Sequence, residues 1–598
     1  MLGQFACLSA LAQTSGDDPL RSLRPEHPRL ILLDSDLDRI RLLTRDHPLA
    51  RHIYGDLEKE CDKLLSIPPV EYKLNGPRLQ GPIRRMMDRI ITLSLMYRVT
   101  KRDPWLRRAI MELNAAANFR DWNPSRFIDT AEMTFAFAIG YDWLYNSLSP
   151  EERAWMRDAI VTKGLDQALP IYQKQNWWTR DRLNWNVVCN SSMALAALAI
   201  AEVNGETDIH DKSAAVLRAA VDSVPHGLSA WGLDGGWPEG PFFGELATRY
   251  GAFLFSGLDT ALGKDFWLGT LHGFDRAGRY RVYTTGPTNK VFNFGDAPEE
   301  PGMAPELLWL AKRFNAPALA WNEQKQLEKS THPDAFDLAW FDRDAKPPQP
   351  PAWPLDSVFH SISVAVFRSS WEDPAGLFLA VKGGDNKATH AHLDLGTFVF
   401  DAGNIRWASD LGSDDLLPPT LPRNVSYRIR TESHNTLLID GESQDPKAEA
   451  KITRQEFSPD LSWVQIDLSK ASTKVRQWTR RVGMAQRQAV LIQDSLHSDQ
   501  PVEVLWGMIT DTEISLNGPT ATLHKNGWNL TAEIRSPRHA VFDVAPARGS
   551  APQQANTKYQ KLIVRLFEKV TDLDLNIVLT PWRDGQPKPK VTAQFPAS

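Results

Sequence analysis

The chain has 598 residues, of which 42% are apolar and 24% charged, and its formal net charge is −5. This length exceeds what one hydrophobic core supports, so two or more domains are expected. The composition is that of an ordinary globular protein, and the negative charge argues against a general nucleic-acid binder. It leaves room for a local basic groove that accepts an acidic glycan.

The N-terminus and the cysteines indicate where the protein is located and which kinds of metal site it can form. Residues 1–12 are mildly apolar and end in an Ala-x-Ala pattern, typical of the end of a secretory signal. We therefore expect a signal-peptide remnant and a periplasmic or secreted protein; an apolar segment without a targeting role is the alternative. No later apolar run is long enough for a membrane span. Cys7, Cys61 and Cys189 form neither a disulfide framework nor a CxxC metal site, so a metal would need His and carboxylate ligands.

Residues 26–345 have the pattern of a helical domain. Ser149 and Glu152 form a capping box at a helix start, and the apolar run 193–200 predicts a buried helix. Many such helices, joined by short turns, show no clean repeat period. The pattern therefore favours an (α/α) toroid of helical hairpins over a regular solenoid.

A proline-rich linker at 346–356 ends the helical pattern. In residues 357–598, short β-branched and aromatic runs without intervening helices predict an antiparallel β-sandwich. The expected fold class is therefore multidomain α+β, with the N-terminal toroid followed by the sandwich and a cleft between them as the default site. The predicted strands are Ser361–Phe367, Leu377–Val381, Thr397–Phe400, Thr436–Ile439, Trp463–Ile466, Val502–Trp506, Leu562–Leu566 and Leu573–Leu579.

The densest polar cluster lies at residues 383–396, where a glycine-containing loop leads into a strand. His390 and His392 are two residues apart, so on an extended chain they point to the same side. The pair could share a metal, or one imidazole could bind metal while the other faces substrate. Two histidines in a sheet without any site are the alternative.

Two further residues favour a metal site. Asp410 ends a predicted neighbouring strand, and His434 lies just before the apolar strand at 436–439. Imidazole and carboxylate groups are suitable zinc ligands, and ligands from three strands would form a rigid site. The spacing fits adjacent strands but does not identify the metal.

The helical region has two polar motifs. Asn184 and Trp185 begin a helix that then becomes apolar, so Asn184 either caps the helix or donates a hydrogen bond to a substrate carboxylate. Residues 234–241 form a glycine-rich turn that contains Asp234 and Glu239. These carboxylates either cap local structure or lie at the rim of a site.

At these residues the sequence resembles the heparinase II/III-like family of polysaccharide lyases, over most of the chain. The most specific part is Asn386 to Asp410 together with residues 433–436, and the Asn184-Trp185 and Pro238-Glu239-Gly240 motifs support it. The resemblance implies a toroid followed by a sandwich, a layout shared with related alginate and heparin lyases.

The resemblance also implies roles for residues of the C-terminal region. His390 matches the family's catalytic histidine, and Tyr427 matches a tyrosine that lines the site. His392, Asp410 and His434 match the family's zinc ligands, where Zn²⁺ is expected to be structural. No redox or nucleotide cofactor is implied.

In the helical region, Asn184 matches the asparagine that neutralises the uronate carboxylate, and Trp185 takes the place of a histidine found in some members. We assign Trp185, Glu239 and Arg249 to substrate binding; Arg249 is also a candidate donor to the carboxylate.

One position departs from the family pattern. Members usually carry a tyrosine that acts as base or acid shortly after the E-G-P-like turn, but residues 242–246 read Phe-Phe-Gly-Glu-Leu. Tyr250 is the first tyrosine after this turn, and it either replaces the missing one or serves packing.

The implied activity is β-elimination of a uronic-acid-containing polysaccharide, which gives a 4,5-unsaturated uronate. The expected partner is an acidic polysaccharide or oligosaccharide, and the sequence is compatible with an oligomer. One alternative is a glycoside hydrolase that uses Asp234 and Glu239 on an (α/α) toroid. Another is a non-catalytic glycan-binding relative, which the missing tyrosine favours.

Overall fold

The computed structural model describes residues 18–202, 207–342, 349–414, 422–551 and 553–596. The expected signal remnant at 1–12 and part of the proline-rich linker lie outside the described residues. The chain divides into a first unit of Met1–Ala230, Glu245–Asp275 and Met303–Gln349, and a second unit of Trp231–Gly244, Arg276–Gly302 and Pro350–Ser598. Two segments that precede the proline-rich stretch therefore pack with the second unit.

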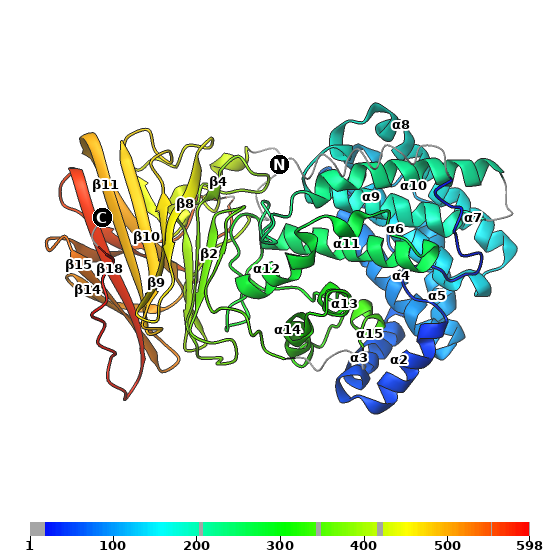
Figure 1. The fold of residues 1–598 in the computed structure, drawn as a ribbon, viewed down its shortest axis with the longest axis horizontal. Coiled ribbons are helices and arrows are strands. Elements are labelled where there is room, and N and C mark those ends of the chain that lie inside the picture. The colour runs from blue at the N-terminus through cyan, green and yellow to red at the C-terminus, as the bar shows by residue number, and fades with distance from the viewer. Residues whose placement is uncertain (1–17, 203–206, 343–348, 415–421, 552, 597–598) are drawn as a thin grey trace. The chain divides into compact units, whose positions relative to one another are not determined.

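The first unit is built mainly from helices (Figure 1). Among the described residues, the α-helices are α2 (Ser35–Asp46), α3 (Pro48–Leu64), α4 (Gln80–Thr100), α5 (Asp103–Ala117), α6 (Phe127–Leu144), α7 (Pro150–Ile160), α8 (Asp166–Lys174), α9 (Asn184–Ile200), α10 (Thr207–Leu228), α11 (Pro241–Leu262), α12 (Ala277–Thr284), α13 (Glu306–Arg313), α14 (Pro317–Leu327) and α15 (Ala335–Ala339).

The helices form an inner and an outer layer. Helix α6 is buried on every side and α9 on nearly every side, and α6 packs against both α4 and α9. Helices α5 and α10 bury only one face, and they cover α4 and α9. Apolar helices inside and amphipathic helices outside are the layers of an (α/α) toroid, so the predicted fold of this region is confirmed.

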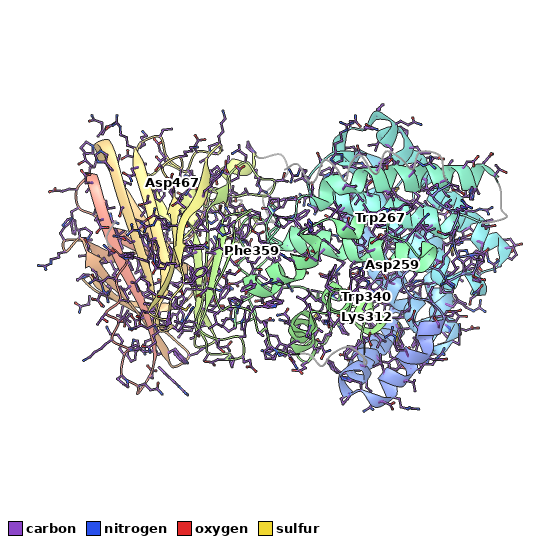
Figure 2. The ribbon with its side chains drawn as sticks, viewed as in Figure 1. Asp259, Trp267, Lys312, Trp340, Phe359 and Asp467 are labelled. Atoms are coloured by element: carbon purple, nitrogen blue, oxygen red, sulfur yellow. The ribbon has the colours of Figure 1, made fainter. Side chains whose placement is uncertain are left out.

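Local signals in the sequence explain how these helices begin and pack. Ser149 caps α7 through the predicted capping box with Glu152, and residues 193–200 are buried in α9 as predicted. Trp340, which is labelled in Figure 2, has its ring centroid 5.5 Å from that of Phe253 and 4.7 Å from that of Phe336. No helix within the described ranges is both long and apolar enough to cross a membrane.

The described strands of the second unit form antiparallel sheets with the orders β1-β2-β3-β5-β6, β13-β14-β15-β18-β11-β10-β9-β8-β4 and β16-β17-β12-β7 (Figure 1). The strands are β1 (Ser357–Phe359), β2 (Val364–Arg368), β3 (Phe378–Lys382), β4 (Gly384–Asp385), β5 (Phe398–Ala402), β6 (Ile405–Ala408), β7 (Leu437–Ile439), β8 (Glu449–Glu456), β9 (Leu461–Asp467), β10 (Gln477–Ala485), β11 (Ala489–Val502), β12 (Val504–Thr510), β13 (Glu513–Asn517), β14 (Thr520–Lys525), β15 (Trp528–Ser536), β16 (Val541–Pro546), β17 (Gln560–Arg565) and β18 (Val570–Arg583).

One apolar core joins the sheets. It includes Phe400 of β5, Val482 of β10 and Trp506 of β12, which come from the three different sheets and are fully buried. Side chains from facing sheets that fill one core are the hallmark of a sandwich, so the predicted sandwich is confirmed.

The predicted strands overlap observed ones, with one correction. The run Val502–Trp506 is not a single strand, because β11 ends at Val502 and β12 begins at Val504. Strands β8 and β13 were not predicted, because most of their residues are exposed and an alternating apolar pattern is therefore weak.

Candidate functional site

A buried cluster of two histidines and one aspartate lies in the second unit. His392 is in the loop before β5, Asp410 follows β6, and His434 precedes β7. One ligand atom from each of the three residues lies within 4.8 Å of the others, and all three residues are buried. The structure thus brings together the three residues that the sequence proposed as metal ligands.

The hydrogen bonds of this cluster leave two ring nitrogens available. His434 Nδ1 lies 2.9 Å from Asp410 Oδ2, but His434 Nε2 and His392 Nδ1 are buried and have no hydrogen-bond partner among the described residues. Burying an unpartnered polar atom costs free energy, and a metal ion would remove that cost. Two imidazoles and a carboxylate form a donor set that suits zinc, so these residues fit the implied ion.

The charge of Asp410 also suits a ligand. Burial opposes ionisation of Asp410, but the neighbouring His434 and His392 and the Gly412 amide outweigh it and lower the pKa of Asp410. Burial lowers the pKa of His392, which favours its neutral form. A neutral imidazole and an ionised carboxylate are the forms that bind metals.

Asp296 connects this cluster to His390, and sequence reasoning missed it. Its Oδ2 lies 2.9 Å from His390 Nδ1, and its Oδ1 lies 3.1 Å from His392 Nε2. Arg423 donates to both carboxylate oxygens, at 2.6 and 2.8 Å. Burial opposes ionisation, but the hydrogen bonds from His390, His392 and Arg423 hold the pKa of Asp296 well below its usual range.

The backbone at Gly295 and Asp296 lies close to the backbone of His390. Asp296 N donates to the His390 carbonyl oxygen at 3.2 Å. Gly295 has φ +66°, and a Cβ there would lie 2.6 Å from the same oxygen, so only glycine fits. His390 itself has φ +65°, so the extended conformation expected at His390 is wrong. His390 and His392 nevertheless point to one carboxylate, because the loop turns at His390.

The ring of His390 is held on its face by Phe243 and at Nδ1 by Asp296. Phe243 stacks on it with ring centroids 3.7 Å apart and an interplanar angle of 12°. His390 Nε2 lies 3.7 Å from Glu239 Oε1, and Trp237 Nε1 donates to Glu239 Oε2 at 3.2 Å. The His390 side chain is 27% exposed, whereas that of Glu239 is 1% exposed. His390 is therefore oriented but reachable, and Phe243 lies in the stretch that lacks the family's tyrosine.

Tyr427 lies in different surroundings from His390. It packs in a buried apolar cluster with Leu411, Ile509 and Ala547, and burial raises the pKa of Tyr427 well above its usual range. Its backbone N–H donates to Gln553 Oε1 at 2.6 Å. Because of this raised pKa, the phenol stays protonated at neutral pH, and little phenolate is present to act as a base.

Asn184 and Trp185 belong to the first unit. Asn184 is the first residue of α9 and is buried; the cap position is Leu183. The ring of Trp185 lies 5.9 Å from that of Trp177, and the Arg126 guanidinium is 5.6 Å from its centroid. Trp185 therefore belongs to an aromatic and cationic cluster.

Arg249 and Tyr250, also in the first unit, have structural surroundings. Arg249 pairs with Glu306 at 3.1 Å and with Asp334 at 3.2 Å. Burial opposes its charge, but these carboxylates outweigh burial and raise the pKa of Arg249. Tyr250 Oη donates to Met87 Sδ at 3.5 Å, and burial raises the pKa of Tyr250 well above its usual range.

The carboxylate of Asp234 is engaged in the glycine-rich turn. It accepts hydrogen bonds from Ser361 N at 3.0 Å, Ser361 Oγ at 2.7 Å and Gly236 N at 3.0 Å. These three local hydrogen bonds hold the carboxylate in place and shape the loop. These contacts disfavour Asp234 as half of a hydrolase pair with Glu239.

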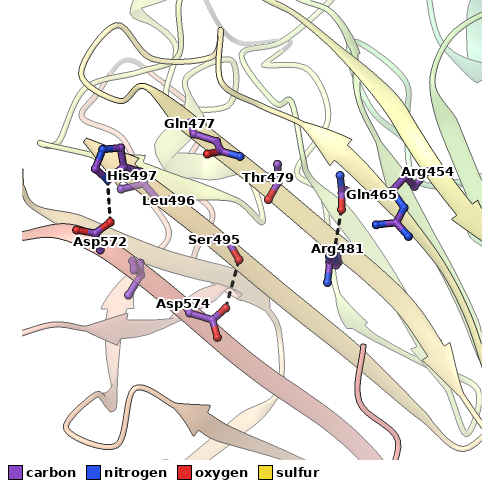
Figure 3. A pocket seen from close by; sticks show the side chains of 11 residues that line it. Arg454, Gln465, Gln477, Thr479, Arg481, Ser495, Leu496, His497, Asp572 and Asp574 are labelled. Atoms are coloured by element: carbon purple, nitrogen blue, oxygen red, sulfur yellow. Dashed lines mark hydrogen bonds and ion pairs between the residues drawn. The ribbon is translucent and has the colours of Figure 1, made fainter. Parts of the chain in front are cut away.

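A polar groove of about 450 Å³ lies on the nine-stranded sheet (Figure 3). Its polar side chains pair with one another: His497 with Asp572 at 2.7 Å, Ser495 with Asp574 at 3.2 Å, and Arg481 with Gln465 at 2.9 Å. Because these groups satisfy each other, the groove has less to offer a ligand than the histidine cluster. The full lining is Arg454, Gln465, Gln477, Thr479, Arg481, Ser495, Leu496, His497, Asp572, Leu573 and Asp574.

The chain is similar to known proteins in one sequence region and in its fold. Residues 356–569 match the family model described as "Heparinase II/III-like, C-terminal". The chain is similar in structure to a mutant of the heparan sulfate lyase HepC from Pedobacter heparinus, with a TM-score of 0.62, 14% identity, and 94% of this chain and 93% of that chain covered. It is also similar to a heparinase III, with a TM-score of 0.61, 12% identity, and 83% and 76% covered.

No curated protein sequence gave a significant match. At these identities the structural likeness shows the fold, whereas the family model covers the region that holds His390, His392, Asp410 and His434. Residues 356–569 thus match the heparinase II/III-like C-terminal model, and the chain shares the fold of these two solved lyases.

Proposed function

We propose that this protein is a polysaccharide lyase that cleaves a uronic-acid-containing polysaccharide by β-elimination. The family-model match and the shared fold support this class. The observation that carries the proposal is the state of His390, a partly exposed imidazole fixed by Asp296 on Nδ1 and by Phe243 on its face. A ring that is held but reachable suits proton transfer.

In the proposed reaction the C5–H and C4–O bonds of the uronate break and a C4–C5 double bond forms. His390 Nε2 takes the C5 proton, and the imidazolium that forms gives a proton to the departing glycosidic oxygen. Proton transfer by a positioned side chain contributes roughly 10²- to 10⁴-fold in rate. Zinc on His392, Asp410 and His434 would hold the segments that carry these ligands together and so fix the His390 loop.

Charge stabilisation is assigned to Asn184, because the negative charge that builds on the uronate carboxylate needs preorganised donors. This role follows the resemblance. Arg249 is a weaker candidate, because its guanidinium already pairs with Glu306 and Asp334. Tyr250 and Tyr427 are weaker candidates, because burial raises the pKa of each and leaves little phenolate at neutral pH to act as a base.

The test is a screen of acidic polysaccharides, including heparan sulfate and alginate, for a product that absorbs in the ultraviolet. We expect absorbance to rise with the wild-type protein and not with His390→Gln. New reducing ends without absorbance would indicate hydrolysis instead. Saccharide binding without any product would indicate a binding protein. Either result would overturn the lyase proposal.

A further inference from the structure

We propose that Asp296 is a positioning residue that sets the tautomers of two histidines at once, with the proton of His390 on Nδ1 and that of His392 on Nε2. The inference concerns a residue outside the predicted site, in a segment far from both histidines in the sequence. It rests on the proposed function only for the consequence at His390; the tautomers themselves do not depend on it.

The carboxylate of Asp296 is fully used as an acceptor. Oδ1 faces His392 Nε2 at 3.1 Å and Arg423 at 2.8 Å, and Oδ2 faces His390 Nδ1 at 2.9 Å and Arg423 at 2.6 Å. An ionised carboxylate only accepts hydrogen bonds and offers about four lone-pair sites. Both facing ring nitrogens must therefore carry hydrogen.

For His390, this fixes the less common tautomer. Neutral histidine in water favours the proton on Nε2, but the bond to Asp296 keeps it on Nδ1. The lone pair then lies on Nε2, the nitrogen on the side of Glu239, in a side chain that is 27% exposed. The lone pair is on the atom that the proposed reaction needs.

For His392, the same carboxylate fixes the opposite tautomer. A proton on Nε2 leaves the lone pair on Nδ1, which is the buried nitrogen without a partner. That atom is available to the cluster with Asp410 and His434. A histidine that donates its second ring nitrogen to a carboxylate is the usual support of a metal ligand.

Two features hold Asp296 in place. Arg423 donates hydrogen bonds to both oxygens in a bidentate pair, which fixes the plane of the carboxylate. Gly295 allows the backbone to approach His390, so the Asp296 N–H donates to the His390 carbonyl. The carboxylate thus reaches both rings from one fixed position.

The first test uses the unaltered protein. With ¹⁵N-labelled histidine at alkaline pH, where histidines are neutral, nitrogen–proton correlation spectra report which ring nitrogen carries hydrogen. The signals are assigned with His390→Gln and His392→Gln. We expect Nδ1–H for His390 and Nε2–H for His392. A proton on Nε2 of His390, or on Nδ1 of His392, would overturn the proposal.

The second test is Asp296→Asn, which keeps the size of the side chain but leaves one acceptor oxygen and one donor nitrogen. Only one histidine can then keep its bond, so at least one ring signal should change tautomer. Affinity for zinc, titrated with zinc chloride alone, should fall roughly 10- to 100-fold. Unchanged ring signals together with unchanged zinc affinity would contradict the role of Asp296.

Asp356→Asn is the matched control. Asp356 forms a bidentate pair with Arg487 in the same unit, at 2.5 and 2.6 Å. Its loss should cost similar stability and leave the ring signals and zinc affinity unchanged. If Asp356→Asn reproduces the changes of Asp296→Asn, the effect is general loosening and the proposal fails. If only the lyase assay is negative, the proposed function fails and the tautomer assignment stands.

Discussion

The charged cluster around Arg249 in the first unit and the histidine cluster in the second both bury ionisable groups, but they differ in what remains unpaired. Arg249 reaches Glu306, Asp334 and the Met303 carbonyl, so each guanidinium nitrogen has a partner. In the histidine cluster, His392 Nδ1 and His434 Nε2 are buried without one.

This difference distinguishes buried charged groups that stabilise the fold from buried groups that could bind a ligand. A buried ion pair with its hydrogen bonds completed stabilises the fold around it. Buried donors and acceptors without a hydrogen-bond partner are expected where a ligand supplies the missing partner. The two clusters should therefore respond differently to mutation: one through stability alone, the other through metal content and turnover.

The largest expected effect is on turnover in His390→Gln. This change removes the proposed proton carrier, so the rate should fall roughly 10²- to 10⁴-fold. The ultraviolet assay measures the rate, and zinc content and the melting temperature serve as controls that should stay near those of the wild type. A fully active variant would end the proposed role of His390.

Arg249→Leu should act on stability alone. It leaves Glu306 buried without its cation, and breaking a buried pair in this way costs about 3 to 5 kcal/mol. Urea denaturation gives the free energy of unfolding. Zinc affinity per folded molecule should be unchanged. A variant of normal stability, or one that binds zinc less well, would contradict the distinction between the two clusters.

His434→Ala should lower zinc content and zinc-dependent stability together, because metal binding is coupled to folding. At a zinc concentration 100 times the dissociation constant, binding stabilises the wild type by about 2.7 kcal/mol. Thermal melts with and without zinc measure this difference. Equal stabilisation of both proteins by zinc would place the metal elsewhere.

The smallest expected effect is that of Gly295→Ala. The added Cβ would lie 2.6 Å from the His390 carbonyl, and positive φ adds strain of about 1 to 3 kcal/mol. Because the loop must shift, turnover should fall more than global stability does. Gly263→Ala, where φ is also positive but the space is open, is the matched control. Equal losses of turnover in both variants would contradict this account.

Much of the fold follows from signals that the sequence displays directly. The capping box at Ser149 and the apolar run in α9 predict helices, and alternating apolar runs predict most of the core strands. In mostly exposed strands such as β8, where Ala450 is the one buried residue, the apolar pattern is too short for periodicity to reveal the strand.

Some residues of the candidate site could likewise be predicted from the sequence, and others could not. His392, Asp410 and His434 stand out because histidines beside predicted strands are a visible pattern, and the structure brings them together. Asp296 lies in a Gly-Asp turn within a predicted helical region, and only the path of the chain places it between His390 and His392. Phe243, likewise, stands out in the sequence only as a missing tyrosine, although it stacks on His390.

The lyase proposal is tested most directly by the mass of the fragments released from a uronic-acid-containing polysaccharide by the wild-type protein. Elimination predicts new non-reducing ends that are lighter by one water molecule than those of hydrolysis. Fragments that carry the full mass of the added water would contradict the account.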